Sequence, residues 1–491
     1  MLANYDYFKD LLGEEGLLEK SSITSEYNTD WTGSFSSNPS LVLLPTTTKE
    51  VSQILSYCHN HTIQVVPQGG NTSLVGASVP LRDEIVLSFK RMNKVLDIEA
   101  SSYTATVQPG VVLEDLKQAT EKHNLYFPLS FGAQHLATVG GFLSTNAGGL
   151  NALRYGVSRD LCLGLEVVLA DGRVLDLESS LRKRNQGIDM KHLFIGSEGT
   201  LGVITKANFK LLPQPSHTTT ISIQFKNLDL FQSIYELAME YYYHELTAFE
   251  ICSKEILEVA THAFHSRSLT KHTTDVPNFE PNHHVLLLEF THFQEASEQS
   301  NQQIQNFILA LKHQLTSLNH SNSDYIILNL YTNPQEQETL WDFRKILPDA
   351  QKALGPTLKH DISLPLSRLS SFIQTLEPKL KNLHPKLFAP FFGHVGDGNV
   401  HYNVMHQQQD QEILNELAPQ IAELVYDSVI AYNGAFSAEH GIGQQKRDLM
   451  KRYLPEETLD TLQTIKQTFD PKGILNPHKV FDFEPINIDL S

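Results

Sequence analysis

The chain has 491 residues, of which 41% are hydrophobic and 19% are charged, and its formal net charge is −18. This length predicts two or three domains, because a single hydrophobic core rarely grows beyond roughly 300 residues. The composition is that of a globular protein and excludes a disordered or fibrous one. The acidic balance argues against a nucleic-acid or anionic-membrane partner, because such surfaces bind clustered Lys and Arg.

Three cysteines, Cys58, Cys162 and Cys252, lie far apart in the sequence, and none belongs to a CxxC pair. This fits a reducing compartment and excludes a disulfide framework. The opening stretch MLANYDYFKDLLGEEGLLEK lacks a basic region followed by an apolar run, and its acidic residues argue against a transit peptide. The cysteine usage makes the cytoplasm the expected location. Because no stretch approaches the roughly 20 apolar residues of a membrane span, no transmembrane segment is expected.

In chain order, residues 41–66 predict a strand, a helix and a second strand, since Val51, Ile54 and Leu55 have helical spacing and IQVV is rich in β-forming residues. Glycine then clusters between residues 69 and 202, in PQGGNTSLVGAS, TVGGFLSTNAGGL and GSEGTLGVI, with strand-like runs between these loops. Glycines at successive loops indicate a backbone that lies close against one extended ligand.

From about residue 217 to 385 glycines are few, and short β-rich runs alternate with longer amphipathic helices. This pattern predicts an antiparallel sheet covered by helices. The predicted strands are 218–225, 283–293 and 325–332, and the predicted helices are 228–243, 294–319 and 334–354. A further helix from residue 411 ends at Asn433-Gly434, and another spans about 456–469.

The first glycine loop has the composition of an anion-binding loop. It lacks GxGxxG and GxxxxGK[ST], so it is neither a Rossmann turn nor a Walker loop. Gly69 and Gly70 permit positive φ and present consecutive N–H groups, while Asn71, Thr72 and Ser73 add short polar side chains. The alternative is a tight structural turn, but three such loops in one half of the chain favour a ligand.

Three long motifs carry a specific resemblance: VVPQGGNTSLVGASVP, PLSFGAQHLATVGGFLSTNAGGLNALRYGVSRDLCLGLEVVLADGRVL and FIGSEGTLGVIT. Together they resemble the FAD-binding domain of the vanillyl-alcohol oxidase and p-cresol methylhydroxylase superfamily. Within it, residues 40–482 are similar to the D-2-hydroxyacid dehydrogenase branch, which includes D-lactate, glycolate and D-2-hydroxyglutarate dehydrogenases.

The resemblance implies an α+β fold with four segments. After an N-terminal segment (1–39), a two-part FAD-binding domain of the p-cresol methylhydroxylase (PCMH) type spans 40–215. A substrate or cap domain, with an antiparallel sheet covered by helices, spans 216–435 and carries the metal-ligand hairpin. A helical C-terminal segment, 436–491, returns to the flavin site.

The resemblance also implies which residues contact FAD. They are Pro67, Gly69, Gly70, Asn71, Thr72, Ser73, Leu74 and Gly76 in the first loop, Pro128, Thr138, Gly140, Gly141, Ser144, Asn146, Gly148 and Gly149 near the flavin and its phosphates, Glu198, Gly199, Gly202 and Ile204 on the adenosine side, and Asn476. Some members of the superfamily bind flavin covalently through a histidine of the first loop. Asn71 follows the two glycines here, so non-covalent FAD is expected.

In FFGHVGDGNVH, two histidines flank a Gly-Asp-Gly stretch. If Asp397-Gly398 forms a two-residue hairpin turn, His394 lies directly across from His401 with Cβ atoms roughly 5 Å apart. Two imidazoles so placed can bind one divalent metal, most plausibly zinc. The alternative is a structural hairpin with solvated histidines, because 22 histidines make a close pair unremarkable by itself.

Downstream, FSAEHGIG offers Glu439 and His440. On an extended backbone these neighbours point to opposite sides, and the flexibility of Gly441 and Gly443 permits a bend that turns both to one site. An ordinary loop remains the alternative. By resemblance to the two metal-site motifs of the branch, His394, His401 and Glu439 would bind Zn²⁺ or another divalent metal such as Mn²⁺, and His440 would be the catalytic base.

The resemblance places Arg344 and Lys359 at positions that bind substrate carboxylate, and Asn403 at a position typical of hydroxyglutarate-type members. His440 would also contact substrate. Pro348 departs from the pattern, since the corresponding residue there carries a hydroxyl and a proline side chain cannot donate. Arg344, Lys359 and Asn403 make D-2-hydroxyglutarate the first expected substrate, oxidised to 2-oxoglutarate by hydride transfer to flavin N5, whereas Pro348 counts the other way and keeps D-lactate or another short D-2-hydroxyacid as the alternative.

Two other functions stay open at this point. One is a zinc hydrolase whose glycine loops bind a nucleotide, and the other is a non-catalytic flavoprotein subunit, against which the intact metal and base motifs argue. For the leading function we expect an electron acceptor such as an electron-transfer flavoprotein or a quinone, and a homodimer is one expected assembly.

Overall fold

The computed structural model describes residues 2–265, 277–318 and 326–480, and these form two compact units. Unit 1 comprises Met1–Gly148, Gly156–Gln214 and Glu439–Ser491, and unit 2 comprises Gly149–Tyr155 and Pro215–Ala438. Residues 319–325, where one predicted helix ends and one predicted strand begins, and residues 481–491 of the predicted C-terminal segment lie outside the described residues.

Unit 1 begins with helix α1 (Leu2–Leu12) and the short helix α2 (Ser25–Asn28), followed by a four-stranded sheet of order β1-β2-β4-β3. The strands are β1 (Leu17–Glu19), β2 (Leu41–Leu43), β3 (Val65–Gln68) and β4 (Ile85–Ser88), and both β2 and β3 are parallel to β4. Helix α3 (Thr48–Asn60) joins β2 to β3 and buries Val51, Ile54 and Leu55, which confirms the predicted strand-helix-strand opening.

The second sheet of unit 1 is antiparallel, in the order β5-β6-β10-β8-β9. Its strands are β5 (Val95–Glu99), β6 (Thr104–Val107), β8 (Cys162–Val168), β9 (Val174–Leu177) and β10 (Val203–Lys210), and β7 (Leu125–Tyr126) pairs with β11 (Leu212–Pro213). The helices of this part are α4 (Leu113–Glu121), α5 (Val139–Ser144), α7 (Ser158–Leu161) and α8 (Lys191–Phe194).

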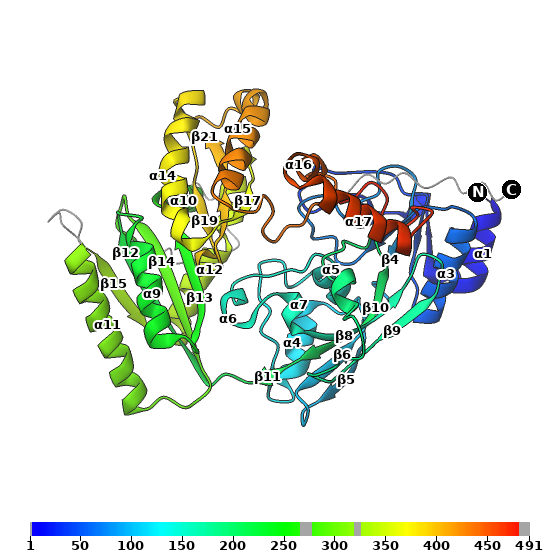
Figure 1. Ribbon diagram of the computed structural model, residues 1–491, viewed down its shortest axis with the longest axis horizontal. Coiled ribbons are helices and arrows are strands. Elements are labelled where there is room, and N and C mark those ends of the chain that lie inside the picture. Colours follow the sequence, from blue (N-terminus) through cyan, green and yellow to red (C-terminus); the bar gives the residue numbers. More distant parts are fainter. Residues whose placement is uncertain (1, 266–276, 319–325, 481–491) are drawn as a thin grey trace. The chain divides into compact units, whose positions relative to one another are not determined.

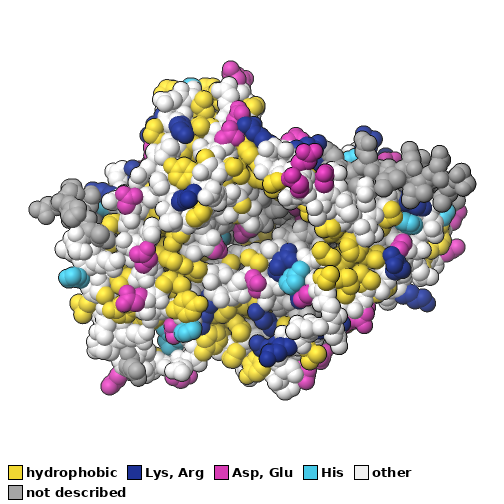
Figure 2. All heavy atoms as spheres, viewed as in Figure 1, with side chains coloured by type: hydrophobic (Ala, Val, Ile, Leu, Met, Phe, Trp, Pro, Cys, Tyr) yellow, Lys and Arg dark blue, Asp and Glu magenta, His cyan; other side chains and the backbone are white. Residues whose placement is uncertain are grey.

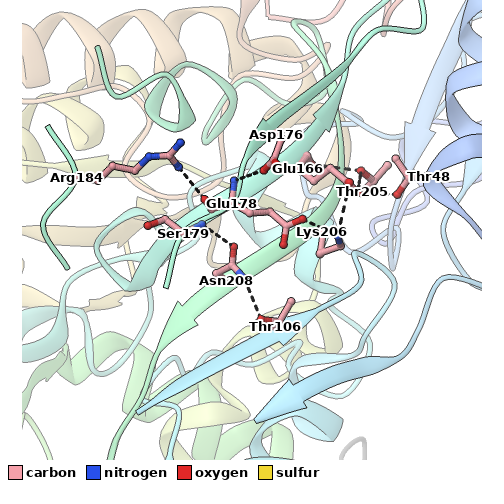
Figure 3. Close-up of polar contacts among 10 residues, drawn as sticks. All are labelled: Thr48, Thr106, Glu166, Asp176, Glu178, Ser179, Arg184, Thr205, Lys206 and Asn208. Carbon is pink, nitrogen blue, oxygen red and sulfur yellow. Dashed lines mark hydrogen bonds and ion pairs between the residues drawn. The ribbon is translucent and has the colours of Figure 1, made fainter. Parts of the chain in front are cut away.

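Polar side chains cross this second sheet and fasten it to helix α3 (Figure 3). Glu166 Oε1 on β8 accepts hydrogen bonds from Thr48 Oγ1 on α3 (2.6 Å) and from Thr205 Oγ1 on β10 (2.9 Å). Lys206 on β10 forms an ion pair at 2.6 Å with Glu178, which lies one residue beyond the end of β9. Helix α3 is thus linked to the second sheet by a half-buried hydrogen bond, and residues of both sheets share one apolar core.

The C-terminal segment completes unit 1. It contains α16 (Arg447–Tyr453) and α17 (Glu456–Phe469), drawn in red in Figure 1, and the second matches the helix predicted at 456–469. After α17 the chain runs alongside β3: the Val65 N–H donates to the Ile474 carbonyl (2.8 Å), and the Asn476 N–H donates to the Val65 carbonyl (2.8 Å). Residues 474–476 therefore cover one edge of the first sheet.

Unit 2 is built on a seven-stranded sheet of order β15-β12-β14-β13-β19-β20-β17, in which all paired strands are antiparallel. The strands are β12 (His217–Phe225), β13 (Leu246–Cys252), β14 (His284–His292), β15 (Ile327–Tyr331), β17 (Asp361–Ser363), β19 (Phe391–Gly393) and β20 (Asn399–Tyr402). A smaller sheet joins β16 (Thr357–Leu358), β21 (Val404–His406) and β18 (Leu387–Phe388).

Helices cover the large sheet of unit 2. Apolar residues of α10 (Lys254–His265), α12 (Pro334–Lys345) and α13 (Leu347–Leu354) form one core with strand residues such as Ala248 and Leu287. Rings of α9 (Leu230–Tyr242) and α11 (Glu298–Leu318) pack on strand residues such as Phe249 and Phe290. The predicted antiparallel sheet covered by helices is thus confirmed; α6 (Ala152–Tyr155), α14 (Leu366–Leu383) and α15 (Gln411–Ala431) complete the unit.

One predicted helix is wrong in its continuity. Residues 334–354 form two helices, α12 and α13, which meet at Ile346. Pro348 explains the break, because a proline inside a helix removes a backbone donor and its ring crowds the carbonyl four residues earlier. Pro348 instead stands in the first turn of α13, where a proline is tolerated.

No helix among the described residues is both long enough and apolar enough to span a bilayer. On the face shown in Figure 2, Lys and Arg side chains are scattered among acidic and uncharged ones. That distribution agrees with the acidic composition of the chain.

Candidate active site

The first glycine loop packs tightly against the residues that precede helix α5. A Cβ atom on Gly70 would lie 2.0 Å from the Leu136 carbonyl oxygen, and one on Gly69 would lie 2.3 Å from Thr138 Oγ1. Neither position has room for a side chain, so the glycines allow the loop backbone to approach the start of α5 directly.

Asn71 gives this loop its shape. Its φ is +53°, and its Nδ2 donates to the carbonyl oxygens of Glu26 (3.0 Å) and Thr29 (2.7 Å). Its Oδ1 accepts a hydrogen bond from Ser78 Oγ (2.7 Å). The Asn71 side chain is therefore committed to holding the loop against the N-terminal segment.

Thr138, just before α5, has a buried hydroxyl oxygen with no hydrogen-bond partner in the part of the chain that the structure describes. A buried hydroxyl without a partner is costly, so a bound group with an acceptor oxygen fits here. Gly140 adds a close backbone approach, since a Cβ there would lie 2.9 Å from Pro109 Cβ. The orphaned hydroxyl and the glycine-lined loops suit the phosphate and flavin oxygens of FAD.

Contacts within unit 1 bring other predicted FAD residues to these loops. A Cβ on Gly199 would meet Pro67 Cγ at 3.2 Å, the Glu198 N–H donates to the Ser144 carbonyl (2.8 Å), and Asn476 Nδ2 donates to the Glu198 carbonyl (2.6 Å). Asn146 Oδ1 accepts from the Arg159 N–H (3.0 Å). Of the rest, Gly149 opens unit 2, and the others lie in unit 1: Thr72, Ser73, Leu74, Gly76, Pro128, Gly141, Gly148, Gly202 and Ile204.

The side chain of Glu198 has a structural task that the sequence did not reveal. Its two carboxylate oxygens accept hydrogen bonds from the N–H groups of Ile442 (2.7 Å) and Gly443 (2.8 Å), in the loop that follows His440. Burial raises the pKa of Glu198 to about 7, although these N–H groups and the charge of Lys446 lower it in part. Glu198 thus anchors the EHGIG loop within unit 1.

Gly441 and Gly443 both have positive φ, +79° and +51°. The chain bends there as predicted, and His440 Nε2 lies 3.8 Å from Glu439 Oε1. The neighbouring side chains therefore do turn toward one another. They begin the segment that returns to unit 1, directly after Ala438 of unit 2.

In unit 2, a buried carboxylate joins two of the predicted site residues. Glu250 lies in β13, whose seven residues are all buried, and it is itself 0% exposed. Its Oε1 is 2.5 Å from His394 Nδ1, and its Oε2 is 2.9 Å from Arg344 Nε and 2.6 Å from Arg344 Nη2. Burial alone raises the pKa of Glu250, but the charges of His394 and Arg344 outweigh this and lower it to about 2.

Arg344, near the end of α12, is 5% exposed and stacks on an aromatic ring. Its guanidinium carbon lies 4.8 Å from the Phe392 ring centroid, and the same ring is 5.0 Å from that of His401. Glu250 Oε2 thus accepts a hydrogen bond from Nε and forms an ion pair with Nη2 of the same guanidinium.

The predicted two-residue hairpin at Asp397-Gly398 is wrong. Residues 395–397 form a 3₁₀ turn, Gly398 adopts a left-handed φ of +84°, and the Asn399 N–H donates to the His394 carbonyl (3.1 Å). His401 consequently faces Phe392 across the strands. The turn is wider than predicted because Asp397 Oδ1 accepts from the Asn399 N–H, which stabilises an extra turn of backbone.

The wider turn still brings the two histidines together, with ring centroids 5.8 Å apart. His401 Nδ1 lies 3.6 Å from Asp361 Oδ1, and Asp361 Oδ2 accepts from the Ala438 N–H (3.2 Å). Each predicted metal-binding histidine thus has a carboxylate beside its Nδ1. Imidazoles with carboxylates close by form a donor set that suits Zn²⁺ or Mn²⁺.

Family models match two long stretches of the chain. A family model described as "FAD binding domain" matches residues 39–178, and one described as "FAD linked oxidases, C-terminal domain" matches residues 214–480. The second covers more than half of the chain. The chain belongs to the FAD-linked oxidases.

Two curated relatives of this FAD-linked oxidase are mitochondrial D-2-hydroxyglutarate dehydrogenase of Arabidopsis thaliana and the D-2-hydroxyglutarate–pyruvate transhydrogenase of Saccharomyces cerevisiae. Each is 34% identical and aligns with 96% of this chain, over 80% and 93% of its own length respectively. The solved structure of p-cresol methylhydroxylase with substrate bound has a TM-score of 0.74, at 17% identity, with 98% of both chains covered. It shares the fold.

These comparisons confirm the predicted superfamily, the α+β fold with a PCMH-type FAD-binding domain, and an FAD-dependent oxidoreductase of the D-2-hydroxyacid type. The alternative of a zinc hydrolase that merely binds a nucleotide is thereby excluded.

Two remaining predicted substrate residues, Lys359 and Asn403, lie in unit 2. Lys359 lies between β16 and β17, and its burial and the charge of Lys352 lower its pKa. Asn403 is buried, its Nδ2 donates to Gln351 Oε1 (2.7 Å), and its Oδ1 accepts from the His360 N–H (3.2 Å). Asn403 therefore ties α13, which carries Pro348, to the strands beside His401.

Sequence reasoning missed Glu250, Asp361 and the anchoring task of Glu198. One signal for Glu250 was available: a single carboxylate stands in LTAFEIC, a run that is otherwise free of charge. A charged residue within an apolar strand needs a buried partner. The identity of the partners was not readable, because Arg344 and His394 are 94 and 144 residues away in the chain.

Proposed function

We propose that this FAD-linked oxidase is a metal-dependent D-2-hydroxyglutarate dehydrogenase. The observation that carries the proposal is the cluster in unit 2, where Arg344 and His394, the residues proposed to bind substrate carboxylate and metal, share one buried carboxylate. The names of the relatives support the substrate class, since both act on D-2-hydroxyglutarate.

The glycine loops and Thr138 of unit 1 would hold FAD, and His394, His401 and Glu439 would hold the metal. Bound FAD would supply an acceptor for the C2 hydrogen with its electron pair, and the divalent ion would supply a Lewis acid for the substrate oxygens. Asp361, which lies beside His401, accepts a hydrogen bond from the Ala438 N–H, and Glu439 directly follows Ala438 in the chain. This continuity of the chain supports Glu439 as the third ligand.

His440 would accept the hydroxyl proton of the substrate as the C2–O bond becomes a carbonyl. The hydroxyl proton would thus pass to a side chain of the protein, bound FAD would take the C2 hydrogen together with its electron pair, and the product would be the 2-oxoacid. Glu198 supports this role, because it fixes the loop on the C-terminal side of His440.

A second candidate substrate is a shorter D-2-hydroxyacid such as D-lactate, and Pro348 favours it. Proline cannot donate a hydrogen bond, so a distal carboxylate would rely on Arg344 and Lys359 alone. An electron-transfer flavoprotein or a quinone is the proposed acceptor; the name of the yeast relative adds a 2-oxoacid such as pyruvate as another. A cytoplasmic location and a homodimer stay predictions.

Anaerobic flavin reduction tests the proposal. Purified protein would be mixed with a panel of D- and L-2-hydroxyacids, before and after treatment with a chelator, and the flavin absorbance followed. We expect bleaching by D-2-hydroxyglutarate, little by the L-enantiomer, and loss of bleaching after metal removal that added Zn²⁺ or Mn²⁺ restores. Bleaching by D-lactate alone would select the second substrate, and full activity in chelator would refute metal dependence.

A further inference from the structure

Glu250 is the carboxylate at the centre of the unit 2 cluster, between His394 and Arg344. It is fully buried, in a strand whose other residues are all buried. Such a charge is tolerated only where cations and hydrogen bonds surround it. The contacts of Glu250 therefore decide why this position carries a glutamate.

The two oxygens of Glu250 serve two different partners. Oε1 contacts His394 Nδ1, while Oε2 accepts from Nε of Arg344 and pairs with its Nη2. An ionised carboxylate has no proton to donate, so in the contact at 2.5 Å the hydrogen must belong to His394 Nδ1. The carboxylate thus fixes the tautomer of His394 and leaves Nε2 as the nitrogen with a lone pair.

Arg344 is held by the same group. Its Nε donates to Oε2, its Nη2 forms an ion pair with the same oxygen, and its guanidinium lies on the face of Phe392, so its orientation is fixed by Glu250 on one edge and by the ring on one face. A displacement of the Glu250 carboxylate would therefore disturb the histidine and the arginine together.

From this geometry we propose that Glu250 is a positioning residue, which sets the Nε2 lone pair of His394 toward a divalent cation and at the same time orients Arg344 for a substrate carboxylate. The inference rests on the proposed function for the identity of the substrate, but its metal-binding half stands on the His394 contact alone. Carboxylates behind metal-binding histidines are known to fix the ring and raise its basicity.

Glu250→Gln is the sharpest test, because an amide has one acceptor and one donor end. If its oxygen stays with the two donors of Arg344, its NH₂ faces His394 Nδ1, which must then lose its proton. The proton moves to Nε2, the atom that binds the metal. We expect affinity for Zn²⁺, measured on metal-depleted FAD-bound protein by competition with a chromogenic chelator, to fall by about 10- to 100-fold.

Two further variants separate the two halves of the role. Arg344→Met removes the carboxylate anchor but leaves Glu250 on His394, so KM for D-2-hydroxyglutarate should rise while Zn²⁺ affinity stays within about threefold of wild type. Glu289→Gln is the matched control: Glu289 lies in the adjacent strand β14, accepts a hydrogen bond from Thr247 Oγ1 (3.2 Å), and within the described part of the chain bonds to neither His394 nor Arg344. It should change neither quantity.

The outcomes of these measurements separate the positioning role of Glu250 from the proposed function. If Glu250→Gln binds Zn²⁺ as wild type does, with FAD content and unfolding temperature unchanged, the inference is overturned even where D-2-hydroxyglutarate reduces the flavin. If no D-2-hydroxyacid reduces the wild-type flavin but Glu250→Gln still weakens Zn²⁺, the proposed function fails and the positioning role stands. If Glu250→Gln does not fold, Glu250→Asp replaces it: this variant retracts both oxygens, and wild-type Zn²⁺ affinity in it would equally refute the role.

Discussion

Two buried glutamates, one in each unit, meet burial in opposite ways. Glu250 is surrounded by Arg344 and His394, and its pKa falls to about 2. Glu198 is met chiefly by the backbone N–H groups of Ile442 and Gly443, and its pKa rises to about 7. Two amide hydrogen bonds and the weaker influence of the Lys446 charge do not offset the loss of hydration at Glu198, whereas the charges of His394 and Arg344 do so at Glu250. Glu250 is therefore charged at neutral pH, while Glu198 is poised between its two forms.

The largest expected effect follows from removing the charge partner. Glu250→Leu leaves Arg344 buried without its carboxylate, and we expect a loss of about 3 to 5 kcal/mol in the free energy of unfolding. The double variant Glu250→Leu/Arg344→Met should recover most of that loss, since no unpaired charge remains. Urea unfolding of the FAD-saturated proteins checks this, and simple additivity of the single variants would show that the pair is not coupled.

Glu198→Ala should cost less, about 1 to 3 kcal/mol, because it leaves two backbone N–H groups without acceptors, whereas Glu250→Leu removes the carboxylate that pairs directly with a buried guanidinium. The same denaturation series measures it. The EHGIG loop is the part that loses its anchor, so hydrogen exchange should accelerate at the amides of Ile442 and Gly443. Unchanged exchange there would mean that other contacts hold the loop.

The pH dependence of stability should reveal the raised pKa of Glu198. Because the pKa of Glu198 is higher in the folded than in the unfolded chain, the folded state binds the extra proton between pH 4.5 and about 7. Its contribution to stability is complete below pH 4.5 and is lost as pH rises through 7. Relative to Glu198→Gln, wild-type stability should fall across this window, by up to about 1.4 kcal/mol per pH unit. A flat difference would refute the raised pKa.

The smallest effect is expected at a partly exposed ion pair. Lys206 is 25% exposed and pairs with Glu178 at 2.6 Å, so Lys206→Met should change the free energy of unfolding by no more than about 1 kcal/mol. A loss as large as that of Glu250→Leu would mean that solvent screens this pair far less than its exposure implies.

Local patterns predicted much of the fold, because strand, helix and turn signals act over short stretches. The strand-helix-strand opening at 41–66, the antiparallel sheet of unit 2 and the helix stop at Asn433-Gly434 followed from spacing and from residues with special backbone freedom. The continuous helix over 334–354 was wrong although its signal was present: Pro348 was weighed as a substrate contact and not as a helix breaker.

The sequence motifs predicted only those parts of the site whose residues lie within the motifs. His394 and His401 do lie together, but the register was wrong because the Asp397 side chain stabilises a wider turn than a two-residue hairpin. Glu250 and Asp361 escaped notice since their tasks depend on partners that only the folded sheet brings near. Whether Glu198 also contacts the adenosine side of FAD stays a prediction; its carboxylate serves the loop after His440.

The pairing of β3 with residues 474–476 has a consequence for biosynthesis. Strand β3 and the glycine loop that follows it leave the ribosome before any part of unit 2 beyond residue 215, yet the segment that covers the edge of β3 is translated after all of unit 2. At about 5 to 20 residues per second, the nascent chain carries this open strand edge for tens of seconds. The glycine loop and residues 474–476 therefore come together late. During that interval chaperones or transient contacts of the growing chain must protect the open edge of β3.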